Sequence, residues 1–162
     1  MFNNKNLLIT GGTGSFGTSF CNHLLKKYKP KKIIIFSRDE LKQSLMQKKL
    51  SPIHQKVIRF FIGDIRDLGR LSLAMEDVDY GVHAAALKQV DVAEYNPMEF
   101  IKTNVIGSEN IVKAALSSNV RKVIALSTDK ASDPINLYGA TKLTADKIFT
   151  SSNNLVGKKK LR

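Results

Sequence analysis

Residues 7–17 read LLITGGTGSFG, an apolar run followed by a loop with glycines three positions apart. These glycines are Gly11, Gly14 and Gly17. The apolar run is typical of a short strand, and the residues beyond the loop favour an amphipathic helix because apolar side chains recur every four positions. They are Phe16, Phe20, Leu24 and Tyr28. Glycine permits a tight turn and a close backbone approach to a pyrophosphate, and the helix N-terminus then offers unpaired N–H groups. A strand before and a helix after the glycines is the context that this motif requires, so the sequence predicts a dinucleotide-binding loop.

Strand and helix patterns alternate along the rest of the chain. Expected strands lie at 7–10, 31–37, 57–62, 80–83 and 122–126, and expected helices at 16–28, 40–50, 68–75, 97–118 and 138–152. The continuous apolar run KKIIIFS of the second strand is typical of a parallel strand buried on both faces. Five βα units in series predict the α/β class, with a Rossmann-like, doubly wound parallel sheet that binds NAD(P) in one domain over residues 1–162. The sequence stops in the basic stretch 158–162, at the point where a sixth strand would be expected. We therefore expect the sheet to end before a sixth strand and the C-terminal substrate-binding part to be absent.

The helix expected over 97–118 has a recognisable start. Asn96 suits the N-cap, Pro97 the first helical position and Glu99 the first turn. Its buried face is expected to carry Met98, Ile101, Val105, Val112 and Leu116.

Composition limits the class of protein. The chain has 162 residues, 43% of them hydrophobic and 25% charged, as in ordinary globular domains. No apolar run approaches the about 20 residues that span a bilayer, and the N-terminus has no signal-peptide pattern. The single cysteine, Cys21, excludes an internal disulfide and suits a reducing compartment, and we expect it to pack inertly. These features predict a cytoplasmic protein with no membrane partner.

The net charge of +12 raises the question of nucleic-acid binding. Much of the excess lies in two lysine-rich clusters, at 26–32 and 158–162. Neither cluster carries interleaved aromatic residues on which bases could stack. We therefore interpret both as solvated surface and expect no nucleic-acid partner.

The end of the second strand decides the cofactor. An acidic residue there usually binds the ribose 2′-hydroxyl of NAD, whereas an arginine suits the 2′-phosphate of NADP. Here Ser37 and Arg38 end the strand, and both can bind a phosphate dianion, which favours NADP over NAD. In the alternative interpretation, Asp39 caps the next helix and Arg38 simply faces solvent.

Two further segments are expected to contact the cofactor. After the third strand, Asp64 and Ile65 could hold the adenine amino group and cover its ring, while Asp67 more plausibly caps the following helix. After the fourth strand, the alanine run 84–86 lets the chain pass close beneath a cofactor, although tight packing explains it equally well.

Three polar residues near these segments have separate interpretations. His83 lies inside the fourth strand and is interpreted as a core histidine rather than a catalytic one. Lys88 follows at the strand end and could touch a substrate phosphate. Asn104 could hold a structural water or the helix backbone near the site, or lie exposed. The complete set of expected cofactor-binding residues is Gly11, Thr13, Gly14, Ser15, Phe16, Gly17, Ser37, Arg38, Asp64, Ile65, Ala84, Ala85, Ala86, Lys88, Asn104, Tyr138 and Lys142.

Residues 127–142 read STDKASDPINLYGATK and carry the candidate chemistry. Tyr138 and Lys142 are four positions apart, so on a helix they share one face. A tyrosine hydroxyl is a poor base at neutral pH, but a nearby ammonium favours the phenolate. The remaining candidate catalytic residues are Thr128, Asp129 and Lys130. They follow the fifth strand at its carboxyl end, where ligands of open α/β sheets bind.

With these motifs placed, the sequence resembles an extended short-chain dehydrogenase/reductase. More closely, it is similar to the inverting UDP-N-acetylglucosamine 4,6-dehydratase family of polysaccharide biosynthesis. The motifs that carry the resemblance are TGGTGSFG, FSRDELKQ, FIGDIRD, HAAALK, EYNPMEFIKTNV and STDKASDPINLYGATK. Lys130 stands where the related retaining dehydratases have a glutamate, which is the pattern of the inverting branch. The chain departs from the family at residues 89–91, where Gln-Val-Asp replaces the usual His-Val-Pro, and in length, because family members are about twice as long.

The resemblance implies a lyase that dehydrates a UDP-sugar in surface-polysaccharide or flagellin-glycan sugar synthesis. Tyr138, as the phenolate, would take the O4 proton while hydride moves from C4 to NADP+, with Thr128 hydrogen-bonded to O4. Lys130 would then remove H5, and Asp129 would protonate the departing 6-hydroxyl. Hydride would return to C6, and C5 would be reprotonated on the other face. The resemblance also implies homo-oligomers in full-length relatives, and no metal site is expected.

Two alternatives stay open at this point. Without a substrate-binding half, the chain could be a non-catalytic dinucleotide-binding remnant or a cofactor sensor. A nucleotide-sugar 4-epimerase would share Thr128, Tyr138 and Lys142 but would not need Asp129 and Lys130.

Overall fold

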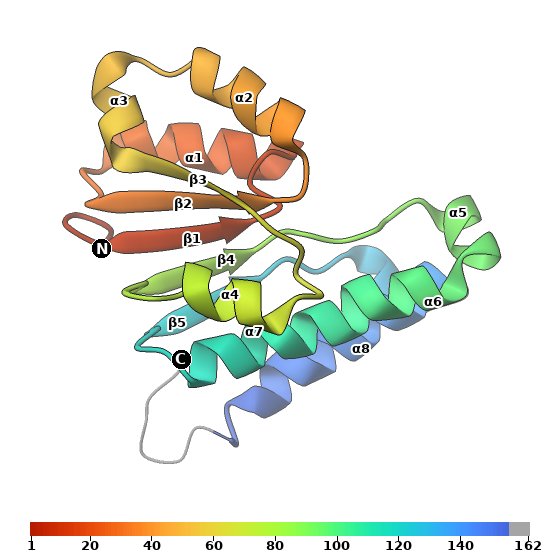
Figure 1. Cartoon of the computed structure of the whole chain (residues 1–162). Helices are drawn as coiled ribbons and strands as arrows, with labels where there is room; N and C mark the ends of the chain where they lie inside the picture. Colours follow the sequence, from red (N-terminus) through yellow and green to blue (C-terminus); the bar gives the residue numbers. More distant parts are fainter. Residues whose placement is uncertain (156–162) are drawn as a thin grey trace.

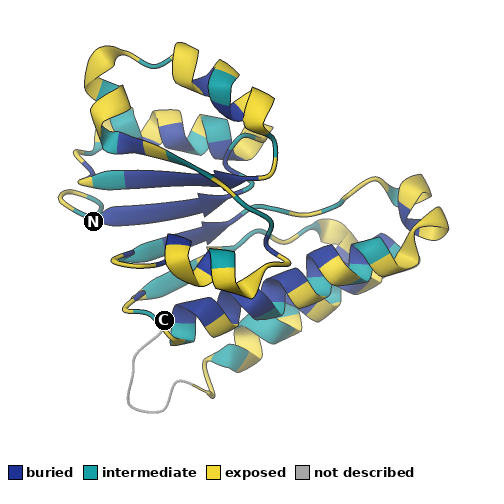
Figure 2. Cartoon of the chain, in the orientation of Figure 1, coloured by how far each residue is buried: buried dark blue, intermediate teal, exposed yellow. Residues whose placement is uncertain are grey.

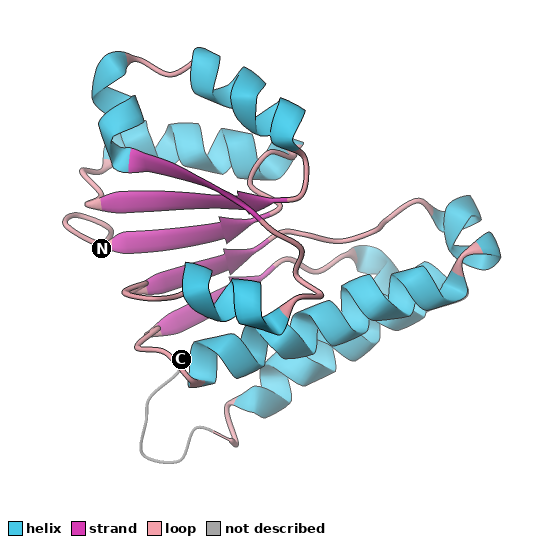
Figure 3. Ribbon diagram, viewed as in Figure 1, coloured by secondary structure: helices cyan, strands magenta, loops and turns pink. Residues whose placement is uncertain are grey.

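The computed structural model describes residues 1–155, and the basic stretch 158–162 lies outside them. Its centre is a five-stranded sheet in the order β3-β2-β1-β4-β5 (Figures 1 and 3). The strands are β1 (Asn6–Thr10), β2 (Lys32–Ser37), β3 (Ile58–Ile62), β4 (Tyr80–His83) and β5 (Lys122–Ala125). Every pair of neighbours is parallel, so all the carboxyl ends meet at one edge of the sheet. The predicted Rossmann-like parallel sheet is confirmed.

Helices cover both faces of the sheet, with α1, α2 and α3 on one side and α4, α7 and α8 on the other (Figure 1). Their bounds are α1 (Ser15–Lys27), α2 (Glu40–Lys48), α3 (Pro52–Val57), α4 (Leu68–Ala74), α5 (Val90–Tyr95), α6 (Pro97–Phe100), α7 (Gly107–Leu116) and α8 (Leu137–Ser152). Among residues 1–155, no helix has the length and apolar character needed to cross a membrane.

The core consists of two layers, one on each face of the sheet. Successive side chains of a strand point to opposite faces, so Leu7 and Ile9 pack with Cys21 and Leu24 of α1. On the other face, Leu8 packs with the residues of α4 and α7 that are buried there, namely Leu71, Ala74, Ile111, Ala114 and Ala115. This double burial explains the continuous apolar strands, and Figure 2 shows β1 and β2 as almost entirely buried. Burial raises the pKa of the Cys21 thiol to about 11.

The expected buried face of α1 was wrong at its first position. Phe16 is 43% exposed, and the residues of α1 that face the core are Gly17, Cys21 and Leu24. The reason is that the first turn of α1 packs against the glycine loop, where a Cβ at residue 17 would lie 2.5 Å from the Gly12 Cα. Gly17 therefore takes the inward position of that turn.

Two helices and one interruption were not expected. The short helices α3 and α5 occupy segments that the sequence pattern left without an element. The helix expected over 97–118 is divided into α6, the π-helical segment η1 (Ile101–Ile106) and α7. Asn96 does not cap it, since its side-chain amide donates to the Val92 carbonyl of α5. Met98 is 56% exposed rather than buried, and Phe100 is buried in its place.

The π-helical segment η1 carries Asn104 into the interior. Its side-chain oxygen accepts from the Leu87 N–H at 2.9 Å, and its amide donates to the Leu87 carbonyl at 2.8 Å. The same amide lies 3.1 Å from the Thr141 hydroxyl of α8. Asn104 therefore fixes the segment after β4 against η1 and α8.

We predict that Asn104→Ala destabilises the fold by about 1–3 kcal/mol, because two partly buried backbone groups of Leu87 lose their partner. Urea denaturation of both proteins measures this difference. Asn22→Ala on the exposed side of α1 is the control, and it should change the free energy of unfolding by less than about 0.5 kcal/mol. Equal stabilities of the Asn104 and Asn22 variants would contradict the assigned role.

Candidate functional site

Two adjoining cavities run along the edge where the strands end. The larger, of about 420 Å³, lies over the ends of β2 and β3, and the smaller, of about 230 Å³, lies between the glycine loop and α8. They share the residues Gly11, Gly14, Ala84, Ala85, Ala86 and Lys88. Because the strand order reverses between β1 and β4, this groove occupies the switch point of the sheet, where open α/β folds bind their ligands.

The glycine loop is pressed against the end of β4. Gly11 has φ +64, and a Cβ added there would lie 2.7 Å from the Ala84 carbonyl oxygen. A Cβ at Gly17 would lie 2.5 Å from the Gly12 Cα. Neither clash is with a flexible side chain, so the loop requires glycine at both positions. The backbone that results forms the shared floor of both cavities.

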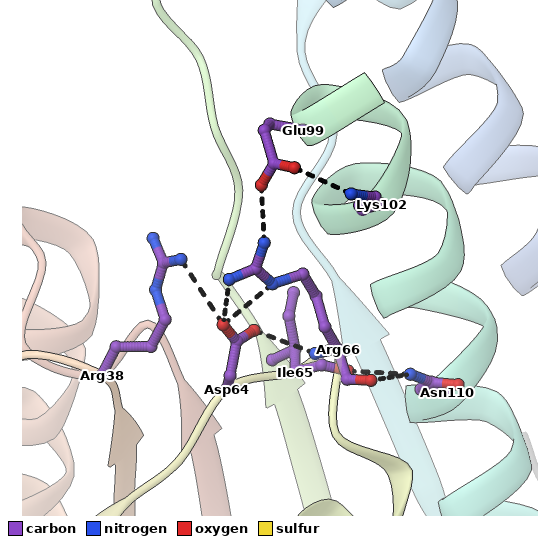
Figure 4. Close-up of polar contacts among 7 residues, drawn as sticks. All are labelled: Arg38, Asp64, Ile65, Arg66, Glu99, Lys102 and Asn110. Atoms are coloured by element: carbon purple, nitrogen blue, oxygen red, sulfur yellow. Dashed lines mark hydrogen bonds and ion pairs between the residues drawn. The ribbon is translucent and has the colours of Figure 1, made fainter. Parts of the chain in front are cut away.

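Arg38 and Asp64 line the larger cavity, and they belong to a group of charged side chains that also includes Arg66 and Glu99 (Figure 4). Arg66 pairs with Asp64 at 2.7 Å and with Glu99 of α6 at 2.7 Å. Arg38 lies 3.5 Å from the same Asp64 carboxylate, with its side chain 53% exposed. Although partial burial opposes the shift, the hydrogen bonds and charge of Arg66 and the charge of Arg38 hold the pKa of Asp64 below its usual value. Asp64 is thus anionic, and Arg38 remains available to a ligand.

Asp39 has the structural role that the alternative interpretation gave it. Its carboxylate caps α2 by accepting from the Lys42 N–H at 2.9 Å, and Asp67 caps α4 in the same way through Arg70. Ser37 lines the cavity, and its hydroxyl receives a 3.0 Å hydrogen bond from the buried Gln43 side chain. Arg38 lines the cavity as well, and about half of its side chain remains exposed.

Two residues that line the larger cavity had no signal in the sequence. Lys42 borders it from α2. Thr103 of η1 is 5% exposed, and its hydroxyl has no hydrogen-bond partner among residues 1–155. A buried hydroxyl without a hydrogen-bond partner is unfavourable. Thr103 borders the larger cavity, so a ligand bound there could supply the partner. Sequence reasoning singled out the neighbouring Asn104, which does not line either cavity and acts through Leu87.

The smaller cavity brings the tyrosine and lysine to the glycine loop. Asn136 caps α8 by accepting from the Gly139 N–H at 2.8 Å, which sets the start of the helix that carries both residues. Tyr138 is 8% and Lys142 7% exposed, and both line the cavity. The Lys142 ammonium donates to the Leu126 carbonyl at 2.6 Å. Burial lowers the pKa of Lys142, while the charge of Asp146 raises it.

The other three candidate catalytic residues line neither cavity; they follow Ser127, which lines the smaller one. Thr128 precedes the 3-10 turn η2 (Asp129–Ala131), and its hydroxyl donates to the Asp129 carboxylate at 2.9 Å. Asp129 lies 3.6 Å from the Lys130 ammonium, and their side chains are 85% and 49% exposed. The hydrogen bond from Thr128 and the charge of Lys130 lower the pKa of Asp129.

The groove gathers most of the expected residues. Those that line at least one cavity are Gly11, Thr13, Gly14, Ser15, Phe16, Gly17, Ser37, Arg38, Asp64, Ile65, Ala84, Ala85, Ala86, Lys88, Tyr138 and Lys142. Within residues 1–155, no group of three or more His, Cys, Asp or Glu side chains is close enough to hold a metal ion. The arrangement suits an extended ligand with phosphates over the glycine loop and a reactive end near Tyr138.

Comparison with known proteins gives one consistent picture. A family model described as polysaccharide biosynthesis protein matches residues 7–162. The UDP-N-acetylglucosamine 4,6-dehydratase (inverting) of Campylobacter jejuni subsp. jejuni serotype O:23/36 is 59% identical over 162 residues, which are 100% of this chain and 48% of that protein. The UDP-glucose 4-epimerase of Rickettsia bellii is 50% identical over 91% of this chain and 43% of its own. The chain spans about half the length of the curated relatives that it matches.

Two solved structures support the fold. Pen from Bacillus thuringiensis has a TM-score of 0.93 at 44% identity and covers 99% of this chain and 48% of its own. DesIV, a dTDP-glucose 4,6-dehydratase from Streptomyces venezuelae with NAD bound, has a TM-score of 0.82 at 26% identity and covers 94% of this chain and 52% of its own. The fold is therefore a dinucleotide-binding fold.

His83 lies between the smaller cavity and the core and gives the site a pH dependence. It is 3% exposed, and its Nδ1 lies 2.7 Å from the Thr10 hydroxyl oxygen. Burial and the positive charge of Lys142 lower the pKa of His83 to about 3. The unfolded chain binds this proton near pH 6.5, so the contribution to stability is present above that pH and is lost as pH falls towards 3.

We predict that acidification from pH 6 to pH 4 destabilises the unmodified protein more steeply than it destabilises the His83→Gln variant. The difference should be up to about 1.4 kcal/mol per pH unit, the value for one proton. Urea denaturation at several pH values measures it, and the acidic groups contribute equally to both proteins. Parallel pH dependences would show that His83 is not held neutral.

Proposed function

We propose that this chain, which belongs to the polysaccharide biosynthesis protein family, is the NADP-binding part of a C5-inverting UDP-N-acetylglucosamine 4,6-dehydratase. The resemblance drawn from its motifs is confirmed by the family match and by the relative of 59% identity. The observation that carries the proposal is the smaller cavity, where Tyr138 and Lys142 face the glycine loop. The proposed pathway is sugar synthesis for a surface polysaccharide or a flagellin glycan.

The residues of the groove fit a nicotinamide dinucleotide. Gly11 and Gly14 line both cavities, and the N-terminus of α1 favours a pyrophosphate beside them. Thr103 offers a buried hydroxyl to the adenosine side. NADP is favoured over NAD because Ser37 and Arg38 line the larger cavity, and a guanidinium can pair with a 2′-phosphate.

Lys42 strengthens the positive charge on the same side. Its ammonium lies 3.3 Å from the Asp39 carboxylate, and both side chains are largely exposed. The pair is weak at such exposure, so Lys42 is free to turn towards a phosphate in the cavity that it borders.

The residues of the chain divide the chemistry between them. Bound NADP+ would accept hydride from C4 of the sugar and return it to C6. Tyr138 takes the O4 proton, and Lys142, which is four positions further along the same helix, lines the same cavity. Thr128 donates a hydrogen bond to O4, which fixes the sugar for that transfer.

Asp129 and Lys130 carry the elimination. A 4-keto group acidifies H5, which Lys130 removes, and Asp129 gives a proton to the departing 6-hydroxyl, which leaves as water. Once hydride has returned to C6, a proton adds to C5 from the opposite face, which inverts C5. In the free chain both side chains are exposed and line neither cavity. A lysine acts as a base only after it loses its proton, and burial beneath a bound sugar favours that loss. The proposed substrate is a UDP-sugar, because the relative of 59% identity is a UDP-N-acetylglucosamine 4,6-dehydratase.

A 4-epimerase is the second candidate, and the UDP-glucose 4-epimerase of Rickettsia bellii, 50% identical over 91% of this chain, favours it. An epimerase needs proton transfer at O4 by Tyr138 with Lys142 and Thr128. It has no use for an acid and a base beside C5 and C6. The adjacent Asp129 and Lys130 therefore favour the dehydratase.

We predict that the chain binds NADP+ more tightly than NAD+, and that Arg38→Ala narrows the difference by about 1.5–3 kcal/mol, the range for a hydrogen bond to a charged group. Titration calorimetry with both cofactors measures it. Arg59→Ala is the control, since Arg59 is exposed at the opposite end of β3 and should leave the difference unchanged. Equal affinities of the unmodified chain for the two cofactors would overturn the NADP assignment.

We predict that residues 1–162 bind NADP+ but convert little or no UDP-N-acetylglucosamine, because a pocket at the switch point is completed by whatever lies above the strand ends. Turnover by residues 1–162 alone at about 10 s⁻¹ would refute the division into two parts.

Transferred into a full-length relative, Lys130→Ala should still reduce NADP+ but stall before C5 inversion, whereas Tyr138→Phe should give no NADPH absorbance. Rapid-mix absorbance and deuterium incorporation at C5 measure the two steps. A Lys130→Ala enzyme that still forms the inverted, deuterated product would refute the role of Lys130.

A further inference from the structure

Helix α8 holds the end of β5 at two successive residues. Lys142 donates to the Leu126 carbonyl at 2.6 Å. One turn later on the same helix, Asp146 accepts a short hydrogen bond from the Ser127 hydroxyl. Residues four apart lie on one face of a helix, so the spacing of Lys142 and Asp146 matches two consecutive residues of the extended chain.

Few other hydrogen bonds hold this segment within residues 1–155. β5 is the edge strand of the described sheet and pairs only with β4. The last backbone bond of this ladder joins the Leu126 N–H to the His83 carbonyl at 3.0 Å. Beyond it, among residues 1–155, the Thr128 hydroxyl bonds only to Asp129 and Lys130, which belong to the same turn. That turn also packs on the start of α8, since Ala131 is buried and a Cβ at Gly139 would clash with the Lys130 carbonyl oxygen. Its position relative to Tyr138 therefore depends on contacts with α8, and the Ser127–Asp146 hydrogen bond is the one that holds its upstream end.

The two ties differ in what else they must do. On the proposed function, the Lys142 ammonium faces the cavity beside Tyr138, where it supports the phenolate and meets the cofactor. Asp146 lines neither of the two groove cavities and has no part in that chemistry. A hydroxyl bound to a carboxylate is also among the stronger hydrogen bonds of a protein. Asp146 can therefore keep the strand end in place while Lys142 is engaged with a ligand.

We propose that Asp146 is a positioning residue, which acts through the Ser127 hydroxyl to fix the strand end that presents Thr128, Asp129 and Lys130 to the groove. The inference rests on the proposed function for the roles of these three residues. The restraint itself is a property of the free chain. It assigns a purpose to a carboxylate on α8 that no step of the dehydration uses.

Amide hydrogen exchange of the whole chain, followed by NMR without cofactor, tests the restraint. The reporters are the amides of Leu126, Ala131 and Ser132, which donate to the carbonyls of His83, Thr128 and Asp129. In Asp146→Ala and in Ser127→Ala, we expect these amides to exchange at least about tenfold faster, as for the loss of a hydrogen bond to a charged group. The amides of β1 and β2 should keep their rates.

Three further variants separate positioning from general stability. Ser127→Thr retains the hydroxyl and should restore the slow exchange. The double variant Ser127→Ala/Asp146→Ala should exchange no faster than either single one, because both remove the same bond. Asp133→Asn removes an exposed carboxylate close to the turn and should leave every rate unchanged. Ser127→Ala alone suffices should Asp146→Ala fail to fold.

Unchanged exchange of the three reporters in Ser127→Ala would overturn the proposal, and so would a uniform acceleration that includes β1 and β2. Calorimetry with NADP+ on the same samples separates this result from the proposed function. A chain that shows the local acceleration but binds no dinucleotide would retain the restraint and lose the proposed function. A chain that binds NADP+ but lacks the acceleration would do the reverse.

Discussion

The backbone contact between the glycine loop and the end of β4 is the constraint on which the site depends. Gly11 adopts φ +64, and its Cα lies so close to Ala84 that a Cβ would stand 2.7 Å from the carbonyl oxygen. This contact brings the start of α1 to the point where the strand order reverses. The two cavities meet over the loop for the same reason, and their shared floor is backbone. A larger residue at Gly11 would separate the helix from β4 and divide the groove.

Features set by local chemistry could be predicted from the sequence. A strand buried on both faces must be apolar in its interior, as residues 33–36 (IIIF) of β2 are, and the helix caps at Asp39 and Asp67 need only a carboxylate before the first turn. The grouping of Tyr138 with Lys142 and the glycine loop followed from helical spacing and from the parallel sheet, because all the strand ends share one edge. These parts of the fold and of the candidate site depend on residues close together in the chain.

Features set by contacts between distant segments could not be predicted in this way. Thr103 borders the cavity because η1 is a π-helix, and no spacing rule indicates the wider turn. Asn96 meets Val92 instead of capping a helix, because the unexpected α5 ends beside it. Asp146 has the ordinary appearance of a surface residue on α8, and only the arrival of Ser127 from β5 gives it a partner. In each case the side chain is unremarkable in sequence, and its role comes from what the fold places against it.

The candidate catalytic residues differ in how far this chain buries them. Tyr138 and Lys142 are buried, and the fold of this chain alone lowers the pKa of Lys142 by desolvation. Asp129 and Lys130 are largely exposed, so water screens their charges and weakens their mutual attraction. Proton transfer to and from carbon needs such groups desolvated around the reacting atoms. On the proposed function, residues 1–155 themselves bury Tyr138 and Lys142, whereas Asp129 and Lys130 would be desolvated only when a sugar and the protein around it cover them.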